Sequence, residues 1–143
     1  CTGNTCRSPL AEAIVKRMVS DAGRTDIEVA SAGVQAWNGS PASDEALLVG
    51  LERNLDLSDH RSRLLTPEIA GASDLILTMS ESHVAHVKKL NPHARVHLLA
   101  GFASADGKDR TIQDPFGGDL AAYRETADEL ERELAGLLDR IGR

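Results

Sequence analysis

The first eight residues of the chain, Cys1 to Ser8 (CTGNTCRS), constrain its fold more than any other segment. Gly3 lets the backbone turn tightly and approach an anion closely. Pro9 comes next and is favoured in the first turn of a helix, so the segment predicts a loop that leads into a helix N-terminus. The N–H groups of such a loop and the positive end of the helix dipole together bind phosphate.

Two side chains of this loop suit phosphate chemistry. Arg7 can donate to two phosphate oxygens at once through its planar fork. Cys1, surrounded by these positive groups, is expected to ionise and to attack as a thiolate. The alternative is a buried cysteine beside an ordinary Gly-Asn turn. A single mechanism accounts for the whole octapeptide, so we favour the phosphate loop.

Composition narrows the class of protein. The 143 residues are expected to form one domain, 1–143, and the net charge of −6 argues against nucleic acid as a partner. No apolar run is long enough to span a membrane and no secretory signal is seen. The two cysteines, Cys1 and Cys6, indicate neither a disulfide scaffold nor a zinc site. We therefore expect a cytoplasmic monomer that binds no nucleic acid and no membrane.

Apolar periodicity predicts an α/β chain. Helices are expected over 9–22, 43–51, 66–71 and 80–90 and from 119 onward, with strands over 27–31, 75–79 and 96–99. Ser8 is expected to cap the first helix and Gly23 to end it. Because strands alternate with helices, the sheet should be parallel, and its carboxyl ends should carry the site. We also expect a further strand ahead of Cys1, which this sequence does not contain.

A second catalytic candidate lies just before the last helix, in Asp114-Pro115-Phe116-Gly117-Gly118. A phosphate ester or phosphoramidate needs its leaving group protonated as it departs. A carboxylic acid held near the thiolate can supply that proton and later activate water. Alone, an Asp-Pro pair is usually only a turn, but the phosphate loop makes the catalytic interpretation stronger. Phe116, two residues from the acid, is a candidate for lining the pocket.

With both motifs present, the chain resembles the low-molecular-weight protein tyrosine phosphatases, and within them the protein arginine phosphatase branch. The family resemblance rests on Cys-x5-Arg-Ser-Pro, Ser31-Ala32-Gly33, His60-Arg61-Ser62-Arg63 and the Asp-Pro-aromatic motif. The branch is indicated by Thr5, Val34, Trp37, Phe116 and Tyr123. The resemblance implies a three-layer α/β fold with a central four-stranded parallel sheet and helices on both faces.

The resemblance also implies roles for the site residues. Cys1 is the nucleophile, Arg7 the oxyanion clamp and Asp114 the general acid. Loop residues 2–6, with Ser8, Trp37 and Phe116, are expected to bind the substrate; those of the loop are Thr2, Gly3, Asn4, Thr5 and Cys6. Ser31 and His60 match a polar network that supports the loop together with Asn4 and Ser8, although from the residues alone they could be ordinary satisfied polar groups. Arg63 matches another position of the family, which is expected to have a structural role.

Thr5 and Trp37 bear on substrate choice. The resemblance implies that Thr5 favours phosphoarginine, because its hydroxyl can meet a guanidinium where a branched aliphatic residue would pack on a phenyl ring. Thr5 could also be a loop residue that tolerates either substrate. Trp37 could stack on the substrate at the entrance or could be a loop anchor packed on the core.

Three smaller expectations complete the site. The family's reversible disulfide carries over to Cys1 and Cys6, the alternative being that Cys6 only fills space. His83 and His86 lie three apart on a helix and are expected on a solvated face rather than in a metal site. We expect no metal and no cofactor.

The resulting hypothesis is a phosphatase that works through a phosphocysteine intermediate on phosphorylated proteins, with phosphoarginine favoured over phosphotyrosine. A thioredoxin-coupled arsenate reductase would need further cysteines, and none follows Cys6. The remote alternative is a non-catalytic phosphate-binding module.

Overall fold

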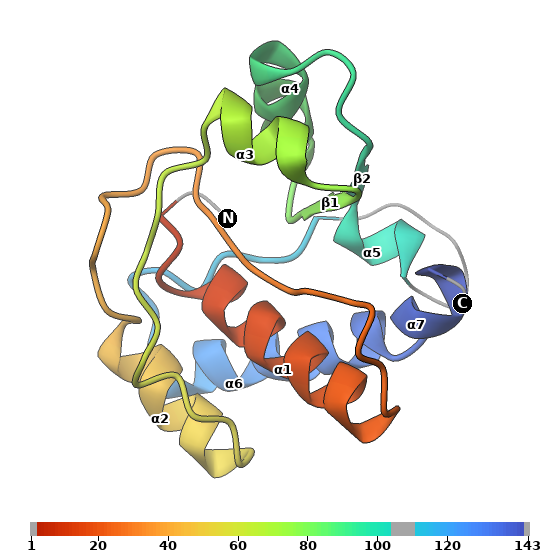
Figure 1. Ribbon diagram of the computed structural model, residues 1–143. Helices are drawn as coiled ribbons and strands as arrows, with labels where there is room; N and C mark the ends of the chain where they lie inside the picture. Colours follow the sequence, from red (N-terminus) through yellow and green to blue (C-terminus); the bar gives the residue numbers. More distant parts are fainter. Residues whose placement is uncertain (1–2, 104–110, 142–143) are drawn as a thin grey trace.

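The computed structural model describes residues 3–103 and 111–141 (Figure 1). The elements in chain order are α1 (Arg7–Asp21), α2 (Asp44–Glu52), α3 (Pro67–Ala72), β1 (Ile76–Thr78), α4 (Glu81–Leu90), β2 (Val96–Leu98), α5 (Leu99–Phe102), α6 (Leu120–Leu134) and α7 (Leu137–Ile141). Each helix expected from the sequence is present within a few residues of its predicted bounds.

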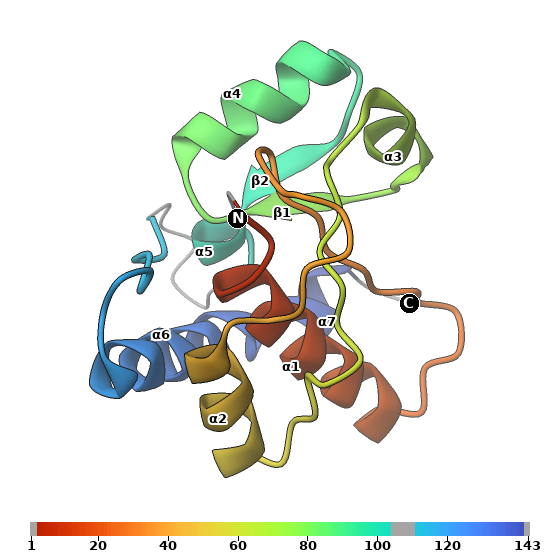
Figure 2. The ribbon, with the colours of Figure 1, turned by 90° about the vertical axis from the view of Figure 1, so that its left-hand side faces the viewer.

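Helices lie on both sides of a small parallel sheet. β1 and β2 pair in parallel, with Ile76 opposite Val96, and α4 forms the crossover between them. In Figures 1 and 2, α3 and α4 lie on one side of these strands, and α1, α2 and α6 lie on the other. The arrangement is the α/β class that the alternating pattern predicts.

The expectation of four strands is not met, because the sheet in the described part of the chain has two. Residues 27–31 form no ladder there. The nearest pairing is an isolated bridge between Gly33 and Leu64. The physical reason is that a strand needs backbone partners in register, whereas the carbonyl of Ser31 accepts instead from the Arg63 side chain at 2.8 Å. The third predicted strand is also shorter than expected, because Leu99 begins α5.

The predicted phosphate loop, described from Gly3 onward, leads directly into the N-terminus of α1 at Arg7. Leu10 and Ile14 of its predicted apolar face are fully buried in the main core. The helix begins earlier than expected: Cys6, not Ser8, occupies the N-cap position, and Ser8 is buried in the first turn. Gly23 ends the helix as predicted, in a left-handed conformation with φ 66°.

Residues 114–118, called the acidic loop below, come just before the N-terminus of α6. Asp119 caps it, its carboxylate accepting from the Ala122 N–H at 3.0 Å. The helix expected from 119 onward is divided into α6 and α7 by a turn at residues 135–136. Its apolar side chains are buried from Tyr123 to Leu137, whereas Ile141 at the end of α7 is exposed.

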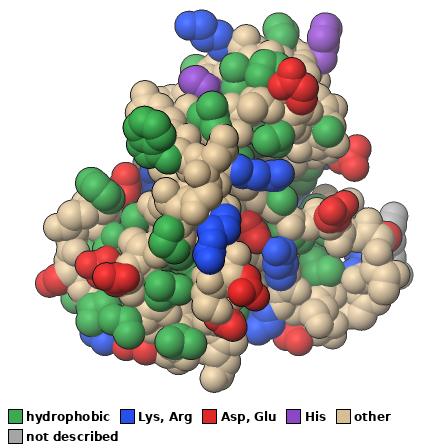
Figure 3. Space-filling view, turned by 60° about the vertical axis from the view of Figure 1, so that its left-hand side comes forward, with side chains coloured by type: hydrophobic (Ala, Val, Ile, Leu, Met, Phe, Trp, Pro, Cys, Tyr) green, Lys and Arg blue, Asp and Glu red, His purple; other side chains and the backbone are tan. Residues whose placement is uncertain are grey.

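The apolar interior has two parts. The larger cluster joins α1, α2 and α6 to the end of β1. The smaller one consists of Ala70, Val87 and Val96, which come from α3, α4 and β2. On the surface, charged side chains of both signs are interspersed with apolar ones (Figure 3). None of the helices in the described ranges is long and apolar enough to cross a lipid bilayer.

Candidate active site

Asn4 is the residue on which the loop turns. It is fully buried and its φ is 57°, in the left-handed region, where an asparagine is tolerated when its side chain is bonded. Its Nδ2 donates to Ser31 Oγ at 2.9 Å, and its Oδ1 accepts from the Arg63 N–H at 3.0 Å. Its carbonyl accepts from His60 Nε2 at 2.7 Å. These contacts bring Asn4, Ser31 and His60 together.

The supporting network extends to a carboxylate that sequence reasoning missed. Ser31 Oγ donates to Glu12 Oε1 at 2.5 Å, and Lys16 Nζ donates to Glu12 Oε2 at 2.6 Å. Burial alone would raise the pKa of Glu12, but the hydrogen bonds from Lys16 and Ser31 outweigh it and hold the pKa below its ordinary value. Glu12 lies four residues after Ser8 on α1, and this helical spacing was the signal available in the sequence.

Gly3 comes directly before the left-handed residue of the loop. A Cβ on Gly3 would lie 3.6 Å from Thr5 Oγ1, an ordinary contact distance. The left-handed turn at Asn4 is supported by the bonds of the Asn4 side chain to Ser31 and Arg63.

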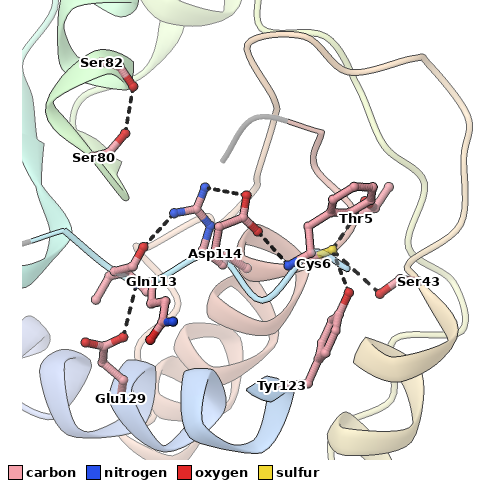
Figure 4. A network of polar contacts seen from close by, with 12 residues as sticks. Thr5, Cys6, Ser43, Ser80, Ser82, Gln113, Asp114, Tyr123 and Glu129 are labelled. Atoms are coloured by element: carbon pink, nitrogen blue, oxygen red, sulfur yellow. Dashed lines mark hydrogen bonds and ion pairs between the residues drawn. The ribbon is translucent and has the colours of Figure 1, made fainter. Parts of the chain in front are cut away.

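Arg7 opens α1 and reaches across to the acidic loop. Its side chain is buried, and Nη1 donates to the Ile112 carbonyl at 2.7 Å. Its Nη2 lies 3.6 Å from Asp114 Oδ2 (Figure 4). Its Nε is buried without a hydrogen-bond partner among the described residues. Burial lowers the pKa of Arg7, while the Asp114 charge opposes that shift. Within the described ranges, Asp114 is the acceptor that faces the Nε–Nη2 edge of the guanidinium, an edge whose two donors suit an anion.

Asp114 lies at the edge of this site. Its side chain is 49% exposed, and its Oδ1 accepts from the Phe116 N–H at 3.0 Å. Gly117, with φ 80°, lets the chain turn toward α6. The carboxylate therefore keeps Oδ2 toward Arg7, while Phe116 itself is 79% exposed.

Cys6 is buried at the edge of the main core, beside three hydroxyl groups. Its Sγ is 3.3 Å from Tyr123 Oη and 3.8 Å from both Ser43 Oγ and Thr5 Oγ1 (Figure 4). Burial and the hydrogen bond with Cys6 raise the pKa of Tyr123 to about 12. Ser43 also caps α2, where its side chain accepts from the Ala46 N–H.

The remaining predicted residues are either exposed or outside the described part of the chain. Cys1 and Thr2 fall outside the described residues, and with them the proposed Cys1–Cys6 disulfide. Trp37 is 84% exposed, so its ring is not packed on the core as an anchor. Its carbonyl accepts from the Ser62 hydroxyl.

His83 corrects an expectation, because it is buried rather than on a solvated face. Burial, with the charge of Arg7 adding to it, lowers the pKa of His83 to about 4, so the ring is neutral at pH 7. Within the described ranges no group of three or more His, Cys, Asp and Glu side chains could hold a metal ion.

The chain is similar to known phosphatases in both sequence and fold. Residues 1–143 match the family described as low molecular weight phosphotyrosine protein phosphatase. The chain is 35% identical over 141 residues to the protein-arginine-phosphatase of Bacillus subtilis, covering 99% of this chain and 93% of that protein. It is 37% identical over 131 residues to the low molecular weight protein-tyrosine-phosphatase PtpB of Staphylococcus haemolyticus, covering 91% and 88%. A solved YwlE arginine phosphatase, a mutant with a phosphorylated active-site serine, superposes with a TM-score of 0.91 at 34% identity, covering 98% and 91%.

Proposed function

The chain belongs to the low molecular weight phosphotyrosine protein phosphatase family, and from that premise we propose that it hydrolyses phosphoarginine in proteins. It is a phosphatase enzyme. The observation that carries the choice of substrate is its likeness, over nearly its whole length, to proteins named arginine phosphatases. Thr5 supports the choice, because it places a hydroxyl in the loop next to Cys6.

The proposed reaction has two steps. The Cys1 thiolate attacks phosphorus, so that an S–P bond forms as the P–N bond of phosphoarginine breaks. Asp114 gives its proton to the departing nitrogen. In the second step the Asp114 carboxylate takes a proton from water, which attacks the phosphocysteine and releases phosphate and the thiolate. The phosphorylated active-site serine of the solved relative supports a covalent phosphoryl intermediate.

Arg7 is proposed to stabilise the charge of the transferring phosphoryl group. Its Nη1 is held by the Ile112 carbonyl, which fixes the plane of the guanidinium. Its Nε and Nη2 are then the donors that can bind two equatorial oxygens. A donor held in place before the reaction stabilises the transition state at little cost in reorganisation.

A second candidate substrate is phosphotyrosine. It is favoured by the likeness to PtpB of Staphylococcus haemolyticus and by Phe116, whose exposed ring could stack on a substrate phenyl ring.

The test is a side-by-side measurement of kcat/KM on phosphoarginine and phosphotyrosine peptides of one sequence, near neutral pH with a reductant. Cys1→Ser is the control, since it should lose turnover while keeping phosphate binding. A preference for phosphoarginine by tenfold or more is expected. A preference for phosphotyrosine would leave the family and mechanism in place and overturn the proposed substrate.

The proposal extends to the state of the enzyme. We infer one phosphatase domain, 1–143, acting as a cytoplasmic monomer on phosphorylated proteins, with no nucleic-acid or membrane partner. Light scattering at micromolar concentration should give the mass of a single chain, and a dimer mass would contradict the monomer.

A further inference from the structure

One extended segment, residues 60–64, holds the phosphate loop in place. His60 Nε2 donates to the Asn4 carbonyl at 2.7 Å, and the Arg63 N–H donates to Asn4 Oδ1 at 3.0 Å. Both bonds end on the residue that sets the turn of the loop. The position of this segment is therefore fixed relative to the phosphate loop.

The same segment also holds the loop 33–41, which carries Trp37. The Gly39 N–H donates to the Ser62 carbonyl and the Ser62 N–H to the Ser40 carbonyl, each at 2.7 Å. The Leu64 N–H donates to Asn38 Oδ1 at 2.8 Å. In Figures 1 and 2 the two segments run side by side between α2 and α3. Segment 60–64 thus joins the Trp37 loop to the phosphate loop.

Ser62 is the side chain at the centre of this junction. It is only 3% exposed, and its hydroxyl accepts from the Ser40 N–H at 3.0 Å while donating to the Trp37 carbonyl. This one hydroxyl therefore binds the backbone of loop 33–41 at two points, Trp37 and Ser40. Trp37 is 84% exposed, so packing holds it little, and these bonds fix the main chain from which its side chain extends.

We propose that Ser62 is a positioning residue that fixes Trp37 relative to the phosphate loop, so that the indole contacts the substrate peptide around the phosphorylated side chain. This inference rests on the proposed function, since it takes Trp37 to face a protein substrate. A contact surface held in place before binding loses less conformational freedom when the peptide arrives. Ser62 itself touches neither phosphate nor substrate.

The first test measures Trp37 directly. Trp37 is the only tryptophan in the chain, so the fluorescence signal belongs to it alone. In Ser62→Ala, time-resolved anisotropy should show a larger amplitude of nanosecond depolarisation than in the wild type. Ser73→Ala is the matched control, because it also removes a hydroxyl bonded to a backbone carbonyl, that of Ile69 at 2.8 Å, and should leave the depolarisation unchanged.

The second test is kinetic. Ser62→Ala should raise KM for a phosphopeptide by roughly 3- to 10-fold, the range expected for one hydrogen bond, while kcat and inhibition by inorganic phosphate change less than about twofold. The KM effect should disappear when Ser62→Ala is made in a Trp37→Ala background. Asn38→Ala, at an exposed position, should act in the same direction if Ser62→Ala fails to fold.

The outcomes separate this inference from the proposed function. Unchanged Trp37 depolarisation in both variants, or an equal KM effect with and without Trp37, overturns the positioning role. The anisotropy measurement needs no substrate, so it still decides how Trp37 is held if phosphoarginine proves to be the wrong substrate. The KM arm is then repeated with phosphotyrosine peptides.

Discussion

Arg7 Nη2 lies 3.6 Å from Asp114 Oδ2, although the two residues lie near opposite ends of the chain. α1 begins at Arg7, and Asp114 lies in the loop just before α6. These helices pack against each other through the main core, so their N-terminal ends bring together Arg7 and Asp114, the proposed oxyanion clamp and general acid.

Replacing Asp114 with Asn should slow the chemical step. The amide cannot donate the proton that the departing nitrogen needs, so kcat on phosphoarginine peptides should fall by roughly 10²- to 10⁴-fold. Inhibition by inorganic phosphate should change little, because Arg7 and the loop amides remain. Asp119→Asn is the control: it removes a nearby charge, and asparagine is an equally good helix cap. Unchanged turnover in Asp114→Asn would show that another group is the acid.

Replacing Thr5 with Ile should move the substrate preference toward phosphotyrosine. The change removes the hydroxyl and adds apolar surface beside the loop. The ratio of kcat/KM for phosphoarginine over phosphotyrosine should fall by about tenfold or more, measured on paired peptides. Thr5→Ser keeps the hydroxyl and should stay near the wild-type ratio. If Thr5→Ile left the ratio unaltered, Thr5 would have no part in discrimination.

Asn4 should contribute to stability through both its bonds and its backbone conformation. Asn4→Ala loses the bonds to Ser31 and Arg63 and places alanine at positive φ, at a cost of about 3 kcal/mol in the free energy of unfolding. Asn4→Gly loses the bonds alone and should cost about 1 kcal/mol less. Denaturant unfolding measures both.

Asn54 provides the control for backbone strain. It is exposed and its φ is 61°, so Asn54→Ala and Asn54→Gly should differ by a similar amount. Equal losses in the alanine and glycine variants at position 4 would contradict the strain argument there.

Tyr123 should titrate well above an ordinary tyrosine. It is the only tyrosine in the chain, so tyrosinate absorbance reports it alone. The absorbance of the folded protein should rise with a pKa near 12 and that of the unfolded chain near 10. Because the folded pKa is the higher one, the associated stability is fully present below pH 10 and is lost between pH 10 and 12.

Two variants bear on this titration. Tyr123→Phe should remove this part of the alkaline loss of stability. Cys6→Ala should bring the pKa of Tyr123 partly back toward 10, because its hydrogen bond with Cys6 favours the neutral form. A folded-state pKa near 10 in the wild type would show that the hydroxyl is hydrated rather than buried against Cys6.

Local signals in the sequence predicted most of the fold. The helix starts expected at 43 and 66 and the stop at Gly23 depend on near neighbours, so the residues alone indicate them; Ser43 and Thr66 cap their helices in the structure. Strand pairing is different, because it depends on a distant partner. The residues at 27–31 cannot show whether a neighbouring strand lies beside them.

The residues of the candidate site also fall into two groups: those that a local motif predicts and those that depend on distant partners. Arg7 and Asp114 were identified by motif, since their chemistry is carried by the residue type. The burial of His83 depends on how α4 packs. The bond from Ser31 to Glu12 depends on how the segment at Ser31 lies against α1, and neither arrangement can be inferred from a single residue. The hydroxyl of Ser62 was not singled out either, because its two backbone partners come from a separate loop.

The unequal size of the two apolar clusters has a consequence for amide hydrogen exchange. The smaller cluster of Ala70, Val87 and Val96 stabilises α3 and α4, whereas the larger one holds α1 and α6. Regions with few buried contacts open more often than the whole protein unfolds. Amides of α4 should therefore exchange faster than those of α1, in openings that leave α1 and α6 closed.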